Sequence, residues 1–201
     1  MSSSILIGWD EHPRGRWEKL PAPNREASKL FGERLAGGRL ELVGEACLED
    51  AIHPDGRIFA ASFPGVSLYC DTQLAIDEPS KLASLAALVP HRTILIHTMS
   101  DGADGFAFAM WSGGSLVRAL SVSPDDGVVE DIGARLAFEL PYWAGEHPVE
   151  PDDEDEDEDE YALPFHPLEL GEEALVALAG LHWASEVADS IVLPRFRLLE
   201  A

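Results

Sequence analysis

Cysteine and long hydrophobic runs are scarce in this sequence, and each scarcity excludes a class of protein. The only two cysteines, Cys47 and Cys70, form no Cys-x-x-Cys pair, so we expect reduced core thiols and no disulfide framework. No run approaches the roughly 18 apolar residues of a membrane-spanning helix. The N-terminus also lacks a basic region ahead of a long apolar run. The cytoplasm is therefore the expected compartment.

The sequence also lacks the short motifs that identify common reactions. It contains no Gly-x-x-x-x-Gly-Lys-Ser/Thr phosphate loop, no Gly-x-Gly-x-x-Gly after a strand and no Gly-x-Ser-x-Gly elbow. The expected strands around Cys47 and Cys70 offer no basic or helix-start neighbour that would activate a thiol. No motif therefore specifies a reaction.

Basic residues are few, and the charge balance is strongly negative. The chain has 37 acidic and 14 basic residues, for a formal net charge of −23, and removing the ten carboxylates of Glu150 and Asp152–Glu160 still leaves −13. Such a surface repels phosphate backbones and anionic headgroups, whereas it attracts a basic protein. We expect no nucleic acid or membrane partner. Solubility alone is the competing explanation of the charge.

Hydrophobic residues make up 46% of the 201 positions, enough for one sizeable core. Helices are expected from the Asn24 cap to Gly37, over Pro79–Leu88, and from about Leu168 to Trp183. The tail Asp189–Ala201 could pair at a sheet edge, cover the core or fray. Short apolar runs separated by turn residues predict these strands: Ser4–Trp9, Leu40–Val43, Ile58–Ser62, Val66–Cys70, Thr93–Met99, Phe106–Trp111, Leu116–Val122, Val128–Ile132 and Leu136–Phe138.

This pattern predicts an α+β fold. The expected architecture is a single domain over 1–201, with an antiparallel or mixed sheet containing a β-meander and covered on one face by about three helices. The acidic stretch at 150–160 is expected to be a solvated, disordered loop, because clustered charge cannot fold by burial.

Two aromatic His-Pro segments flank that acidic stretch, Pro141–Pro148 and Leu163–Gly171. If the segments lie side by side, two imidazoles and two carboxylates could converge as a divalent-metal site or a general acid/base pair. The candidate residues are Glu146, His147, His166 and Glu169, with His147 and His166 as metal ligands. No other cofactor is predicted.

A structural role explains the same residues without chemistry. Both His-Pro units can be rigid turns whose Tyr142, Trp143 and Phe165 pack on the sheet, and His166 can sit at a helix start. His97, inside an apolar strand, fits a buried structural histidine. His182 and Glu186, four residues apart, could share a helix face. Aspartates beside glycines, such as Asp125 and Asp126, close turns.

Several blocks together resemble a family of uncharacterised proteins, found mainly in high-GC Gram-positive bacteria and known only as a domain of unknown function. They are Phe63–Val66, Phe106–Trp111 with its continuation Arg118–Pro124, Glu130–Gly133, Pro141–Pro148 and Leu163–Gly171. The resemblance implies a cytoplasmic single-domain protein and supplies no catalytic residues. At the level of fold, the meander also looks like small bacterial domains that accompany toxins.

Two functions remain open from the sequence. The first is a non-catalytic acidic domain that binds another protein, for which a basic partner is best suited, in a regulatory or immunity-type role. Aromatic residues of the type found at interfaces, Trp9, Trp17, Tyr142 and Trp143, would contribute partner contacts. The alternative is a metal-dependent hydrolase built around the two His-Pro segments. The oligomeric state is left open.

Overall fold

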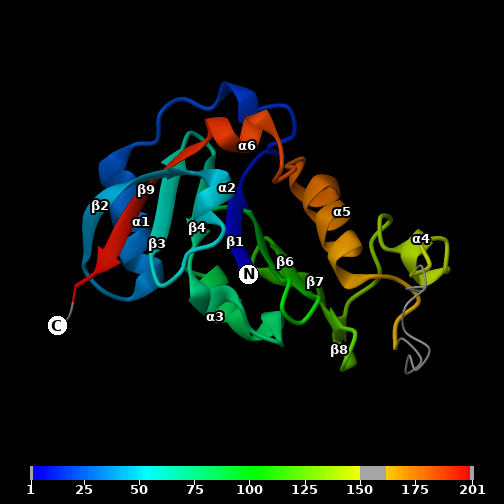
Figure 1. Cartoon of the computed structure of the whole chain (residues 1–201). Helices are drawn as coiled ribbons and strands as arrows, with labels where there is room; N and C mark the ends of the chain where they lie inside the picture. The colour runs from blue at the N-terminus through cyan, green and yellow to red at the C-terminus, as the bar shows by residue number, and fades with distance from the viewer. Residues whose placement is uncertain (1, 150–161, 200–201) are drawn as a thin grey trace.

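One nine-stranded antiparallel sheet organises the computed structural model (Figure 1). The structure describes residues 2–149 and 162–199, so the expectation of a disordered loop at 150–160 lies outside the described residues. The strand order is β2-β9-β3-β4-β1-β5-β6-β7-β8. The prediction of an α+β fold with a meander is confirmed, because β5 to β8 are neighbours in chain order.

The strands are β1 Ser2–Trp9, β2 Leu40–Cys47, β3 Ile58–Phe63, β4 Val66–Cys70, β5 Thr93–Ser100, β6 Gly105–Ser112, β7 Ser115–Ser123, β8 Gly127–Ile132 and β9 Val192–Leu198. The α-helices are α1 Arg25–Ala36, α2 Leu48–Ala51, α3 Ala83–Ala86, α4 Leu140–Trp143, α5 Pro167–Ala179 and α6 Glu186–Ser190. Short 3-10 turns are η1 Trp17–Lys19, η2 Thr72–Leu74 and η3 Pro79–Leu82. None of the helices in these ranges has the length and hydropathy of a membrane span.

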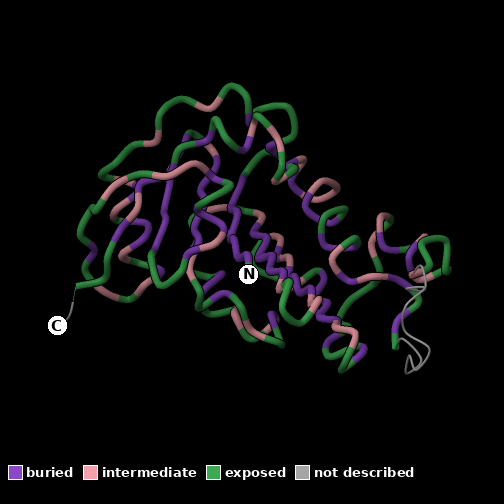
Figure 2. Tube along the Cα trace, viewed as in Figure 1, coloured by how far each residue is buried: buried purple, intermediate pink, exposed green. Residues whose placement is uncertain are grey.

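Both faces of the central strands β1, β4 and β5 are buried. Successive side chains of a strand point to opposite faces, so these strands contribute to two cores. In β1, Ile5 and Ile7 belong to one hydrophobic cluster and Leu6 to the other. Figure 2 shows the buried strands running through the centre of the molecule. The near-continuous apolar run of β1 follows from this double burial.

Helices α1 and α5 pack on opposite faces of the sheet. Phe31 and Leu35 of α1 belong to the cluster that contains Leu6, whereas Leu170 and Leu175 of α5 belong to the cluster that contains Ile5. The expectation of helices on one face only was therefore wrong. A two-sided core requires apolar residues at both alternating sets of strand positions, which β1, β4 and β5 have.

Helix α1 confirms the capping signals of the sequence. The Asn24 side chain accepts a hydrogen bond from the Ala27 N–H at 3.0 Å, and Gly37 ends the helix in the left-handed conformation at φ 68°. Leu30, expected on the apolar face, is instead 56% exposed.

Two predicted elements differ from the structure. Residues Leu136–Phe138 form no strand and lie in the turn before α4. The tail does form a strand, but β9 lies between β2 and β3 and not at an edge. Its apolar residues predicted burial without identifying the neighbouring strands, which are distant in the sequence.

A buried ion pair holds the segment after β8 against β7. Arg118 and Glu139 are both 0% exposed, and the guanidinium donates to the carboxylate at 2.6 and 2.9 Å. Arg118 also donates to Asp131 and to the Ile132 carbonyl. Gly133 is required beside this pair, since a Cβ there, at φ 88°, would lie 2.3 Å from the Val117 carbonyl oxygen.

Glu139→Gln should lower the free energy of unfolding by about 3 kcal/mol, because it leaves the buried Arg118 charge without its main partner. Chemical denaturation measures the change. Arg135→Gln, which removes the 3.7 Å exposed pair between Arg135 and Asp131 and the contact of the guanidinium with the Trp143 ring, is the control and should cost about 1 kcal/mol. Equal effects of the two substitutions would contradict this role.

Candidate functional site

The two His-Pro segments lie against each other through their aromatic rings. The Phe165 ring lies 4.9 Å from Trp143 and 5.7 Å from Tyr142, edge to face. Tyr142 and Phe165 are part of the hydrophobic core, which confirms the packing expected of these turns. The segments therefore fix the position of α4 beside the start of α5.

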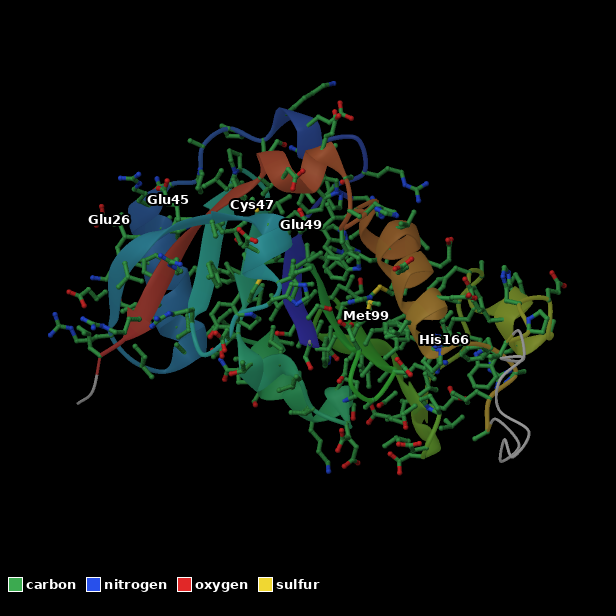
Figure 3. All side chains as sticks on the ribbon, in the orientation of Figure 1. Glu26, Glu45, Cys47, Glu49, Met99 and His166 are labelled. Carbon is green, nitrogen blue, oxygen red and sulfur yellow. The ribbon has the colours of Figure 1, made fainter. Side chains whose placement is uncertain are left out.

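The polar residues of these segments serve different local partners. His147 is exposed and stacks on Tyr142 with ring centroids 4.1 Å apart. His166 caps α5, because its Nδ1 accepts a hydrogen bond from the Leu168 N–H at 3.3 Å (Figure 3). Glu146 and Glu169 are exposed. Within residues 2–149 and 162–199, no group of three or more His, Cys, Asp and Glu could hold a metal ion.

Three of the four aromatic residues named as candidate partner contacts are buried. Trp9 is 4%, Trp17 3% and Tyr142 7% exposed, and the Trp17 indole donates to the Ala179 carbonyl at 2.8 Å. Each of these three rings contributes to the hydrophobic core, and Trp9 and Trp17, expected as exposed-type aromatics, are not exposed. Trp143 is partly exposed, with the Arg135 guanidinium 3.9 Å from its ring centroid. Partner binding by these residues stays a prediction.

His97 is a buried structural histidine, as its position in an apolar strand predicted. It is fully buried beneath α5, and its Nε2 donates to the Gly171 carbonyl at 2.8 Å. Burial lowers the pKa of His97 to about 4, against the opposing effect of that hydrogen bond. Gly171 allows this approach, because a Cβ there would lie 3.1 Å from Met99 and 3.0 Å from Phe106 (Figure 3).

His182 and Glu186 do not lie on one helix. Helix α5 ends at Ala179, His182 follows it in the connecting segment, and Glu186 is the first residue of α6. Gly180, in the left-handed conformation at φ 65°, ends α5 before His182.

The structure brings together Asp10, His91 and Ser67 in the hydrogen-bond order of a catalytic triad. His91 Nε2 lies 2.9 Å from Ser67 Oγ, and His91 Nδ1 lies 3.1 Å from Asp10 Oδ2. The Arg92 N–H donates to the other Asp10 oxygen at 3.0 Å. The hydrogen bonds from the Arg92 amide and from His91 lower the pKa of Asp10.

This array is closed to a substrate. Ser67 is 3% exposed and lies within the regular pairing of β4 with β1 and β3, not on a sharp turn that presents its hydroxyl. None of the three residues lines the hollows described below. The His91 ring lies over Gly8, where a Cβ would come within 2.8 Å of it. The array therefore fixes the loop before β5 to the sheet.

The more open site is a groove at one end of the sheet, made of two hollows that share Ser2 and Ala75. The inner hollow, about 320 Å³, lies where β5 and β7 end and where β6 and β8 begin. The outer hollow, about 800 Å³, lies beside the start of β1 and the segment that follows α2. We call the two hollows together the acidic groove.

The charged side chains that line the acidic groove are nearly all negative. Among residues 2–149 and 162–199, its lining contains no lysine or arginine and one histidine, His53. Five aspartates line it, all of them exposed to solvent, namely Asp50, Asp55, Asp77, Asp125 and Asp126. Thr98 and Ser100 also line the inner hollow, where the Thr98 hydroxyl donates to the Ala107 carbonyl and the Ser100 hydroxyl accepts from the Ser2 hydroxyl. Such a site attracts cations and can accept hydrogen bonds from ammonium or guanidinium groups.

Sequence reasoning identified the excess charge but not this groove. Asp125 and Asp126 were interpreted as turn residues, and Asp126 does accept a hydrogen bond from the Ser123 hydroxyl at 3.3 Å. The five aspartates come from three separate segments of the chain, 50–55, the residues after η2, and the turn between β7 and β8. The successive pairing of β1, β5, β6, β7 and β8 brings these segments to one end of the sheet.

Comparison with known proteins identifies one family. A family model described as a family of unknown function (DUF6928) matches residues 3–197. Neither a curated protein nor a solved structure shows a significant match to the chain.

Lowering the pH should reduce the free energy of unfolding, because His97 is buried in its neutral form. Its pKa is about 4 when folded and roughly 6.5 in an unfolded chain, so the unfolded chain gains the proton first as pH falls. The stabilisation is complete above pH 6.5 and should be lost between pH 6.5 and 4, by about 3 kcal/mol. Denaturation of the protein and of His97→Gln over this range measures the difference, and parallel pH profiles of the two would contradict it.

Ser67 should not react as an activated nucleophile. A fluorophosphonate ester, which labels the serine of open triads, should leave the folded protein unmodified because Ser67 is enclosed. Intact-mass spectrometry detects the adduct. Stoichiometric labelling that disappears in Ser67→Ala would instead establish an accessible triad.

Proposed function

The chain belongs to this family of unknown function, DUF6928, and we propose that it is a non-catalytic, cytoplasmic domain whose acidic groove binds a basic segment of another protein. The observation that carries the proposal is the lining of the groove, with five aspartates and no lysine or arginine among the described residues. A regulatory or immunity-type role fits a domain that acts by binding another protein.

Electrostatics support a basic partner. The five aspartates share one open groove, so their potentials add where a ligand would lie. The formal net charge of −23 adds a long-range attraction for a cationic ligand. The negative surface as a whole therefore attracts a cationic ligand. The groove is the place where the ligand binds, because five aspartates line it.

The shape of the groove supports a chain segment as the ligand. The two adjacent hollows, about 320 and 800 Å³, form an elongated and open site instead of one closed pocket. An extended peptide can lie along such a site with its side chains in successive hollows. Phosphate backbones and anionic lipid surfaces would be repelled by the same aspartates.

The metal-dependent hydrolase at Glu146, His147, His166 and Glu169 stays a prediction. The described contacts of His147 and His166 are those of a stacked ring and a helix cap. No contact among the described residues favours this alternative over the groove.

Neutralising the groove should weaken binding of a basic peptide. We expect Asp77→Asn, Asp125→Asn and Asp126→Asn together to reduce the affinity for an 11-residue lysine-rich peptide at least about fivefold at low salt, because three close charges are removed. Fluorescence anisotropy at 20 and 200 mM NaCl measures the affinity. Binding to the unchanged protein should also weaken as salt rises.

The control removes the same total charge elsewhere. Glu26→Gln, Glu146→Gln and Glu172→Gln are exposed positions outside the groove, with Glu26 on α1 (Figure 3). This variant should bind nearly as well as the unchanged protein. Equal losses in the two triple variants, or equal binding of an acidic peptide, would overturn the proposal.

A further inference from the structure

The floor of the acidic groove is a row of strand ends whose order is fixed by hydrogen bonding. Ser2 pairs with Ser100, Ser100 pairs with Gly105, and Ser123 pairs with Gly127. These residues begin or end β1, β5, β6, β7 and β8, which are neighbours in that order. The groove therefore crosses five adjacent strands at one end of the sheet.

Carboxylates lie at both ends of this row. Asp50 and Asp55 flank the outer end, and His53 Nδ1, 3.1 Å from the Ser2 carbonyl, places their segment beside the start of β1. Asp125 and Asp126 lie in the turn between β7 and β8 at the inner end. The lining between them includes uncharged residues such as Ala75 and Ile76.

The distance between the two ends can be derived from the sheet. Neighbouring strands lie about 4.8 Å apart, so the four spacings from β1 to β8 span about 19 Å. An extended peptide advances about 3.3 Å per residue, and six residues therefore span about 20 Å. Side chains of an extended chain alternate, so residues i and i+6 point to the same side.

The inner hollow is lined by a serine whose backbone and Cβ are buried and whose hydroxyl is open to the hollow. Ser121 is 6% exposed, and its hydroxyl makes no hydrogen bond within residues 2–149 and 162–199. The hydroxyl is also not one of the fully enclosed unpaired atoms, so it faces the open hollow. A bulge in β8 opposite Ser121 and Val122 places Val129 in the same hollow.

This combination suits the two parts of a lysine side chain. The aliphatic stem can lie against Val129 and Ile76, while the ammonium reaches the Ser121 hydroxyl and the nearby aspartates. Because the Ser121 hydroxyl is open to the hollow, its oxygen can accept a hydrogen bond from a ligand ammonium.

We propose that the groove recognises an extended segment with two cationic side chains at positions i and i+6, one of them in the inner hollow over Ser121. This inference rests on the proposed function and adds the spacing that the partner must have. The two charges reach the two aspartate pairs at once, so they act as linked binding events.

Peptides of one composition test the spacing. Three 11-residue peptides carry two lysines separated by two, four or six positions in a background of alanine, serine and threonine. Calorimetry at 50 mM salt should give the i,i+6 peptide an affinity at least about fivefold above that of the i,i+2 peptide. In a double variant that carries Asp50→Asn and Asp55→Asn, the preference for the i,i+6 peptide should disappear. The i,i+2 peptide should bind this variant as tightly as it binds the unchanged protein.

A second pair of variants tests the inner hollow. Ser121→Leu fills the space that the lysine stem would occupy and should weaken all three peptides, whereas Ser115→Leu, at the exposed start of β7, should not. Thermal melting checks that both variants fold. Equal affinities of the three peptides would overturn the proposed spacing. If basic peptides still bind better than acidic ones in that experiment, the proposed function stands without the spacing.

Discussion

The register of the central strands is the constraint on which the site depends. Ser2, Ser100 and Gly105 are successive partners across β1, β5 and β6, so one end of the sheet collects the turns and loops next to them. A shift by one residue would exchange the two buried faces of each strand. Core packing on both faces therefore holds the aspartates in one groove, although their mutual repulsion disfavours that arrangement.

Local signals predicted much of the fold. The Asn24 cap, the Gly37 stop and the turn before Val66 each act within a few residues, and α1 and β4 lie where these signals place them. Strand β9 could not be placed in the same way. Its apolar residues favour burial in any sheet, whereas its position between β2 and β3 depends on the packing of the whole chain.

The candidate site was less accessible to sequence reasoning for the same reason. Net charge predicted an acidic surface, but Asp50, Asp77 and Asp125 come together only through strand pairing. Asp10, Ser67 and His91 likewise meet from three segments without a motif. The His-Pro segments, conspicuous in the sequence, contribute packing and a helix cap to the described structure.

The most direct measurement of the central claim is amide chemical-shift mapping by NMR while a lysine-rich peptide is added. The account predicts that the largest changes cluster at the groove, around Ser2, Ala75, Asp77 and Ser121. Changes spread evenly over the acidic surface, or centred on the His-Pro segments, would contradict it.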